Sequence, residues 1–125
     1  MDVVVTKSRI HGKGVFASRN FKRGELVVDY GLSKVLTKSE VDELPLNDKQ
    51  FVERRKDGKF FFHHSPARFV NHSCESNTIA TDSGNVAVKD IQEGEEITSS
   101  YSDGVTGINV PCKCGSRNCR RILKI

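Results

Sequence analysis

The stretch RFVNHSCESN, from Arg68 to Asn77, sets a dense polar cluster directly after an apolar pair. An amide, an imidazole and a thiol, those of Asn71, His72 and Cys74, fall within four residues. Buried polar side chains need hydrogen-bond partners, so a turn with a satisfied histidine is the plain explanation and a binding site is the other. The rest of the sequence is needed to distinguish a simple turn from a binding site.

Length and composition limit the classes of protein to which this chain can belong. The chain has 125 residues, which fits one domain with one modest core. No apolar run approaches the roughly 20 residues that span a bilayer, and residues 1–20 lack a signal-peptide segment, so we expect an intracellular protein with no membrane contact. The 20 basic against 16 acidic residues give a net charge of +4, which permits anionic partners without requiring them. Residues 117–124 carry four basic residues without aromatics, so direct nucleic-acid binding is disfavoured.

Short β-type segments separated by turn signals dominate the pattern, and long helical periodicity is scarce. The fold class predicted is therefore mainly β. The expected strands are Val3–Thr6, Gly14–Ala17, Glu25–Tyr30, Asn77–Thr81, Val86–Lys89 and Glu96–Ser99. A hairpin is expected over Phe51–His63, because Asp57-Gly58 is a favoured primed-turn pair.

Two helical segments are predicted. Thr37-Lys38-Ser39-Glu40 fits a capping box, and the helix that it opens must end near Leu44 because Pro45 follows. Pro66–Val70 is compatible with a single turn leading into the opening stretch. His63 and His64 show no convincing metal-ligand spacing and are expected to be surface or core residues.

The four cysteines point to a metal site. Cys112, Cys114 and Cys119 fall within eight residues, and three thiolates leave a tetrahedral structural zinc one ligand short. Cys74 is the remaining thiol that could complete the set. Two disulfides are the first alternative and are rare in proteins without a secretion signal. Four unrelated thiols are the second, and the clustering disfavours them.

Four sequence blocks together resemble one family. The first is GKGVFA at residues 12–17, which is similar to the G-x-G-[VIL]-x-A motif of SET-domain protein lysine methyltransferases. RFVNHSCESN resembles the family's R-F-[IV]-N-H-S-C-x-P-N signature, with Ser76 in place of proline. DIQEGEEITSSY at residues 90–101 resembles D-I-x-x-G-E-E-[IL]-T-x-x-Y, and C-x-C-x4-C resembles the post-SET zinc motif. Order and spacing agree from about residue 8 to residue 120.

The resemblance implies a SET-domain fold of small sheets with a C-terminal pseudo-knot, a SET domain at 1–110 and a post-SET zinc-binding tail at 111–125. It implies transfer of a methyl group from S-adenosylmethionine to a lysine ε-amine of a protein. Matched by position, the implied residues are Tyr101 and Tyr30 as catalytic, Lys13, Gly14, Val15, Asn71 and His72 for the cofactor, and Cys74, Cys112, Cys114 and Cys119 for one structural zinc.

The substrate channel is expected to involve Phe61, Phe62 and Ser99. Ser99 stands where many family members carry Phe or Tyr, and its small side chain should leave room for di- or trimethylation. The segment at the family's variable insert, Ser33–Lys59, is brief and charged, so the sequence says little about which protein is the substrate. We expect the catalytic domain to find its target alone or as an oligomer that supplies extra surface.

By analogy the substrate is a histone or another basic chromatin or nucleoid protein, in a nucleus or a prokaryotic cytoplasm. The competing hypothesis is a catalytically silent SET-like zinc module that binds a protein or nucleic acid. The two differ in whether the chain binds S-adenosylmethionine and in whether Tyr101→Phe changes its activity.

Overall fold

A computed structural model describes residues 2–10, 12–31, 33–55, 57–100, 109–111, 117, 119 and 122–124. Strands dominate it, which confirms the mainly β prediction. The strands are β1 (Val3–Lys7), β2 (Lys13–Ala17), β3 (Leu26–Asp29), β4 (Lys34–Leu36), β5 (Val52–Arg54), β6 (Phe60–Phe62), β7 (Asn71–His72), β8 (Thr78–Ala80), β9 (Gly84–Ala87), β10 (Glu96–Ser99), β11 (Asn109–Pro111) and β12 (Ile122–Lys124). The helical segments are α1 (Lys38–Asp42) and the single 3-10 turns η1 (Lys49–Phe51) and η2 (Ala67–Phe69).

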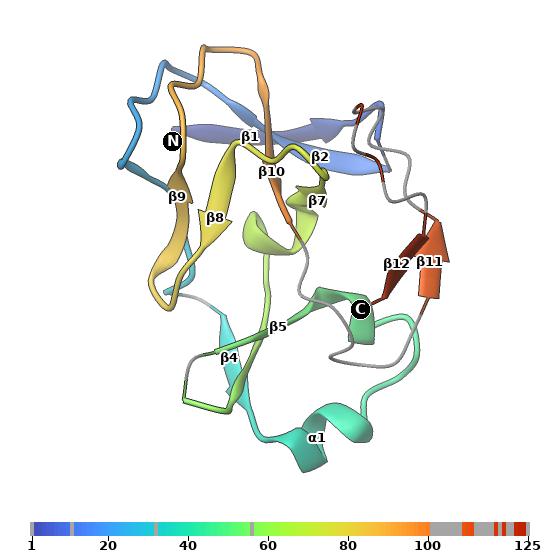
Figure 1. Ribbon diagram of the computed structural model, residues 1–125. Coiled ribbons are helices and arrows are strands. Elements are labelled where there is room, and N and C mark those ends of the chain that lie inside the picture. The colour runs from blue at the N-terminus through green and yellow to red at the C-terminus, as the bar shows by residue number, and fades with distance from the viewer. Residues whose placement is uncertain are drawn as a thin grey trace.

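The main sheet has seven strands, with the order β1-β2-β10-β8-β9-β3 and with β7 paired to β10. β10 runs antiparallel to β2 and parallel to both β7 and β8. The polar stretch after Val70 therefore lies against β10, although more than twenty residues separate the two in the chain. Figure 1 shows β10 passing among β2, β7 and β8 at the centre of the molecule.

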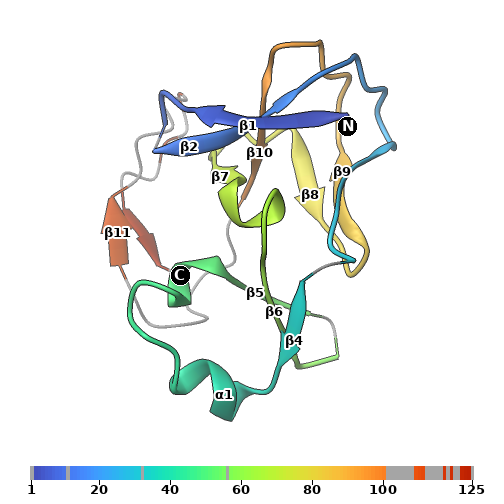
Figure 2. The ribbon, with the colours of Figure 1, turned by 180° about the vertical axis from the view of Figure 1, so that it is seen from behind.

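A smaller sheet has the order β4-β6-β5. Its β5–β6 hairpin confirms the hairpin predicted around Asp57-Gly58, with Gly58 at φ 85°. β4 was not predicted and adds to the free edge of β6. Both ribbon views place this sheet and α1 at the end of the molecule opposite β1 and β2 (Figures 1 and 2).

Each of the six predicted strands overlaps an observed one, and the largest difference is at β9. The prediction began at Val86, but the strand begins at Gly84. A Cβ at Gly84 would lie 1.9 Å from the backbone oxygen of Val28, so the turn glycine itself pairs closely with β3. Sequence alternation cannot show this approach, because it concerns the partner strand.

The core follows the strand alternation. Side chains that are almost fully buried include Val15, Phe21, Val28, Ile91 and Ile97, which belong to one cluster under the main sheet. A second, smaller cluster of Leu36, Val41 and Phe60 joins α1 to the small sheet. Phe61 of β6 belongs to the larger cluster, so this cluster extends from the main sheet to one face of the small sheet.

α1 begins after Thr37 with the predicted capping box and ends at Asp42, with Glu43 as its C-cap. The predicted turn at Pro66–Val70 is η2. Within the part of the chain that the structure describes, no helix has the length and apolar character needed to cross a bilayer. β11 and β12 pair antiparallel, and the predicted domain boundary between residues 110 and 111 falls inside β11.

Candidate active site

Asn71 joins three segments that are distant in sequence. Its Nδ2 lies 3.0 Å from the carbonyl oxygen of Lys13, 3.1 Å from Ser8 Oγ and 3.0 Å from Glu96 Oε2. Because Asn71 is 6% exposed, these contacts supply the partners that its buried amide needs. The structure thus brings the predicted residues of β2 and β7 to one place.

Glu96 belongs to this junction and was not among the residues singled out from the sequence. Its carboxylate accepts hydrogen bonds from the Ser8 hydroxyl at 2.7 and 2.9 Å. A Cβ on Gly14 would lie only 2.5 Å from Glu96 Oε2, so glycine at this position makes room for the carboxylate. The available signal was its place as the second glutamate of the GEE block, at the first residue of β10.

The predicted zinc ligands are only partly described. Cys74 is half-buried, and its Sγ lies 3.2 Å from Nε2 of the buried His72. Cys119 is also half-buried, whereas Cys112 and Cys114 lie outside the described residues. In the described ranges, no three His, Cys, Asp or Glu side chains come together as a metal site. Zinc binding stays a prediction.

Tyr30 approaches β10 from the side of β8 and β9. Tyr101 lies outside the described residues. The Tyr30 hydroxyl donates to Asn85 Oδ1 at 2.7 Å. Asn85 Nδ2 donates to Thr78 Oγ1 at 3.2 Å, and that hydroxyl donates to the carbonyl oxygen of Thr98 at 2.6 Å. A buried hydrogen-bonded chain therefore connects Tyr30 to β10, one residue before Ser99.

The Tyr30 environment favours the neutral phenol. Burial raises the pKa of Tyr30 first, and the negative charge of the nearby Glu53 carboxylate raises it further, while the Asn85 hydrogen bond acts in the opposite direction. The hydroxyl is thus a hydrogen-bond donor at neutral pH and is not a base.

Ser99 is a buried polar residue whose hydroxyl has no partner among the described residues, as expected of a residue beside a ligand. It is 3% exposed. Its backbone pairs with His72 on one strand and Thr78 on another, so this hydroxyl lies where the two halves of the site meet. A buried polar atom that has no partner in the described part of the chain marks a place where a further group or a water fits.

Of the two predicted channel phenylalanines, the structure brings one to Tyr30. The Phe61 ring meets the Tyr30 ring edge-on, with centroids 5.1 Å apart. Phe62 is the next residue on β6 and so faces the opposite side, where it packs against the cluster around Val41.

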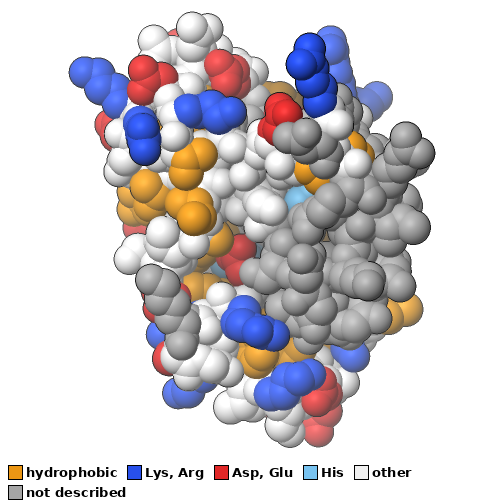
Figure 3. All heavy atoms as spheres, viewed as in Figure 1, with side chains coloured by type: hydrophobic (Ala, Val, Ile, Leu, Met, Phe, Trp, Pro, Cys, Tyr) orange, Lys and Arg blue, Asp and Glu red, His pale blue; other side chains and the backbone are white. Residues whose placement is uncertain are grey.

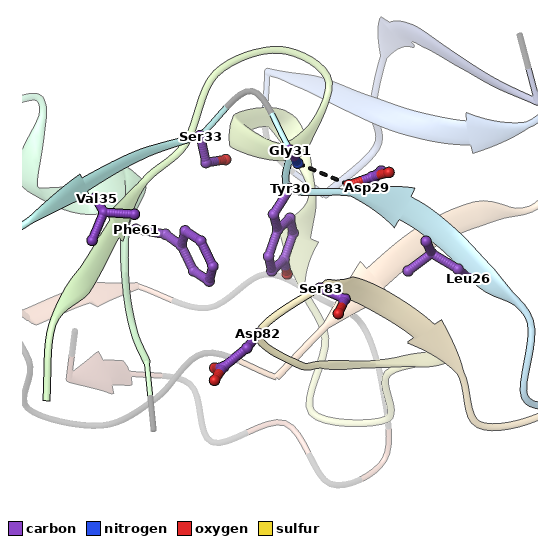
Figure 4. A pocket seen from close by; sticks show the side chains of 9 residues that line it. All are labelled: Leu26, Asp29, Tyr30, Gly31, Ser33, Val35, Phe61, Asp82 and Ser83. Atoms are coloured by element: carbon purple, nitrogen blue, oxygen red, sulfur yellow. Dashed lines mark hydrogen bonds between the residues drawn. The ribbon is translucent and has the colours of Figure 1, made fainter. Parts of the chain in front are cut away.

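An open pocket of about 440 Å³ lies beside Tyr30 and Phe61. Its lining consists of Leu26, Asp29, Tyr30, Gly31, Ser33, Val35, Phe61, Asp82 and Ser83 (Figure 4). Figure 4 shows Tyr30 and Phe61 side by side, with the Asp82 carboxylate directed into the space next to them. In the space-filling view, an acidic and several apolar side chains are visible in a hollow near the centre of the face (Figure 3).

Comparisons with known proteins agree with this arrangement. A family model described as SET domain matches residues 12–102. The chain is 33% identical, over 97% of its length, to histone-lysine N-methyltransferase 2B of Homo sapiens. It is 36% identical, over 91% of its length, to histone-lysine N-methyltransferase set9 of Aspergillus oryzae. It spans only 5% and 19% of these two relatives.

A solved structure shares the fold. It is described as a crystal structure of KRYPTONITE in complex with mCHG DNA and SAH, and it superposes with a TM-score of 0.74 at 22% identity. The match covers 96% of this chain and 28% of that one. At this identity the likeness supports the architecture described above.

Proposed function

The chain belongs to the SET-domain family, and from this premise we propose that it transfers a methyl group from S-adenosylmethionine to the ε-amine of a lysine in a protein. The observation that carries the proposal is the meeting of β7 and β10 beside Lys13, next to the buried Ser99 hydroxyl, which has no hydrogen-bond partner among the described residues. The names of the relatives support lysine as the acceptor. SAH, in the structural neighbour, is S-adenosylmethionine without its methyl group.

The cofactor would be held by the backbone of residues 13–15 together with Asn71 and His72. Two of these groups lie together, because Asn71 Nδ2 donates to the carbonyl oxygen of Lys13 and so holds β7 beside β2 in a largely buried place. When bound, S-adenosylmethionine supplies an activated methyl group on a positively charged sulfur. The protein then has to align the acceptor with it and exclude water.

The acceptor lysine would enter beside Tyr30 and Phe61. A free lysine titrates near pH ~10.4, so it is charged in solution and must lose a proton before it can attack. An apolar wall such as the Phe61 ring lowers the lysine pKa through desolvation. The Tyr30 hydroxyl stays neutral and already donates to Asn85, so its proposed part is to shape the channel while Tyr101 orients the amine.

One structural zinc is proposed for the C-terminal tail, held by Cys74, Cys112, Cys114 and Cys119. His72 would then lie next to the metal site, because its Nε2 contacts Cys74 Sγ. The metal would tie the tail at 111–125 to the SET domain at 1–110. Four thiolate ligands leave no open position for substrate, so its part is architectural.

The proposed substrate class is a histone or another basic chromatin or nucleoid protein, in a nucleus or a prokaryotic cytoplasm. The relatives are named as histone-lysine methyltransferases, which favours histones. Direct contact with nucleic acid is not proposed, and self-association stays a prediction.

The test measures transfer of labelled methyl from S-adenosylmethionine to purified core histones and to a lysate of the source cell. We expect label in wild type and a loss of at least about 100-fold in Tyr101→Phe, the range typical for a group acting in the reaction. Mass analysis should show di- or trimethylated lysine, because Ser99 leaves room for it.

Absence of label in wild type, with folding confirmed, would overturn the proposal. A product restricted to monomethyl-lysine would overturn the role given to Ser99.

A further inference from the structure

Glu53 and His63 form a largely buried acid–base pair on one face of the small sheet. Glu53 lies opposite Phe61 in the β5–β6 register, and His63 follows Phe61 by two residues, so the three side chains share that face. His63 Nε2 lies 2.9 Å from Glu53 Oε2, with 8% and 15% of the two side chains exposed.

This pair lies directly behind the wall of the pocket. The His63 ring centroid is 4.3 Å from that of Tyr30 and 5.5 Å from that of Phe61. His63 Nδ1 lies 2.8 Å from the hydroxyl of Ser33. Because Ser33, Tyr30 and Phe61 all line the pocket, Glu53 is separated from it by one layer of side chains.

The charges around the pocket are mainly acidic. Asp29 and Asp82 belong to the lining, and the described lining residues include no Lys, Arg or His. Arg55 follows Glu53 by two residues on the same face, with its Cζ 5.0 Å from the Phe61 ring centroid. Its Nη2 lies 3.0 Å from Asp57 Oδ2, so Asp57 offsets its charge.

Stability does not explain why a carboxylate is placed here. A largely buried carboxylate carries a desolvation cost that an apolar side chain of similar volume does not, even where a histidine hydrogen-bonds it. Charged groups placed beside a cleft with a perturbed neighbour are more typical of sites that act on a ligand. Tyr30 is such a neighbour, because burial raises its pKa and the charge of Glu53 raises it further.

We propose that Glu53, held in place by His63, determines specificity by attracting the positively charged side chain of the acceptor lysine into the pocket beside Tyr30. This inference rests on the proposed methyltransferase function and names a residue of its acceptor side. The lysine arrives as an ammonium, the form present at neutral pH, and the carboxylate favours its entry over that of a neutral side chain. His63 acts as a positioning residue, because its hydrogen bond fixes the carboxylate.

The kinetic test compares wild type, Glu53→Gln and Glu43→Gln, with core histones and labelled S-adenosylmethionine. Glu43 is exposed at the end of α1, so Glu43→Gln removes the same charge away from the pocket. We expect Glu53→Gln to raise KM for histones at least about tenfold with kcat changed less than about threefold, because the carboxylate attracts the ammonium form during entry, whereas the amine that attacks is neutral. The Kd for S-adenosylmethionine and the behaviour of Glu43→Gln should match wild type.

A binding test isolates the lysine charge. It uses the histone peptide around the labelled lysine and the same peptide with norleucine, which has no ammonium group. Wild type should bind the lysine peptide more tightly, and Glu53→Gln should lose that preference while its affinity for the norleucine peptide stays unchanged. A purely structural role would weaken binding of both peptides and of S-adenosylmethionine together.

Wild type without activity would overturn the proposed function and this inference with it. Active wild type with an equally active Glu53→Gln, or an unchanged lysine preference, would overturn the inference alone. If Glu53→Gln folds poorly, the double variant Glu53→Gln/His63→Gln keeps an uncharged hydrogen-bonded pair and should show the same loss of preference.

Discussion

Tyr30 is 4% exposed, so ionising it would place a negative charge in the core beside Glu53. Burial is the first cause of its raised pKa and the Glu53 charge is the second. Below about pH 10, tyrosine is neutral in the folded and the unfolded chain alike. Above that pH the unfolded chain releases the proton and the folded chain keeps it, so the free energy of unfolding must fall as the pH rises.

We expect wild type to lose stability more steeply between about pH 10 and pH 11 than Tyr30→Phe, which has no phenolic proton. Denaturant unfolding at stepped pH measures this slope. Tyr30→Phe leaves Asn85 Oδ1 without its donor and should cost about 1–3 kcal/mol at neutral pH, so the slopes are compared and the absolute values are not. Equal slopes in the two proteins would contradict the account.

Sequence reasoning identified the site residues that belong to motifs, apart from Glu96, and missed those that depend on strand pairing. Asn71 and Gly14 could be found because the family blocks contain them, and the structure brings them together through Glu96. Glu53 resembles an ordinary exposed charge on a short strand. Its direction is fixed by pairing with β6, which in turn pairs with the unpredicted β4.

Among the elements, α1 depends most visibly on its first residue. The Glu40 N–H donates to Thr37 Oγ1 at 3.3 Å, and the Thr37 N–H donates to Glu40 Oε1 at 3.1 Å. The hydrogen bond from the Thr37 N–H is the first cause of the lowered pKa of Glu40. The helix has five residues, so the cap contributes a large share of what holds Val41 against the small sheet.

Thr37→Ala should therefore lower the free energy of unfolding by about 1 kcal/mol, the usual effect of losing an N-cap side chain. Thr37→Ser keeps the hydroxyl and is the matched control. Urea unfolding of the three proteins measures the difference. A serine variant that loses as much as the alanine variant would show that the Thr37 methyl group matters and the cap does not.

At the scale of the whole molecule, the proposed zinc would link the tail to the middle of the chain. Structural zinc contributes on the order of 10 kcal/mol of apparent binding free energy in zinc-finger peptides. We expect one zinc per chain by elemental analysis, and a chelator should remove hydrogen-exchange protection from β11 and β12 while leaving β1 and β2 protected. Unchanged protection of β11 and β12, or a chain purified without zinc, would contradict the proposal.

The sequence predicted the fold class, mainly β, better than it predicted which strands pair with one another. Alternation and turn glycines are local signals, and they located six strands and the β5–β6 hairpin. The parallel pairing of β7 and β8 with β10 depends on contacts between segments far apart in sequence, so only the resemblance to the SET family pointed to such a crossing.

The position of β10 also determines when the molecule can fold during its synthesis. β2 and β8 are both made before β10, yet they lie on either side of it in the sheet. As the chain leaves the ribosome, the facing edges of these two strands stay unpaired until residues 96–99 emerge. Exposed strand edges favour misassociation of partly folded chains, so a translational pause that holds the chain before residues 96–99 emerge should reduce the yield of folded protein more than a pause after they have emerged.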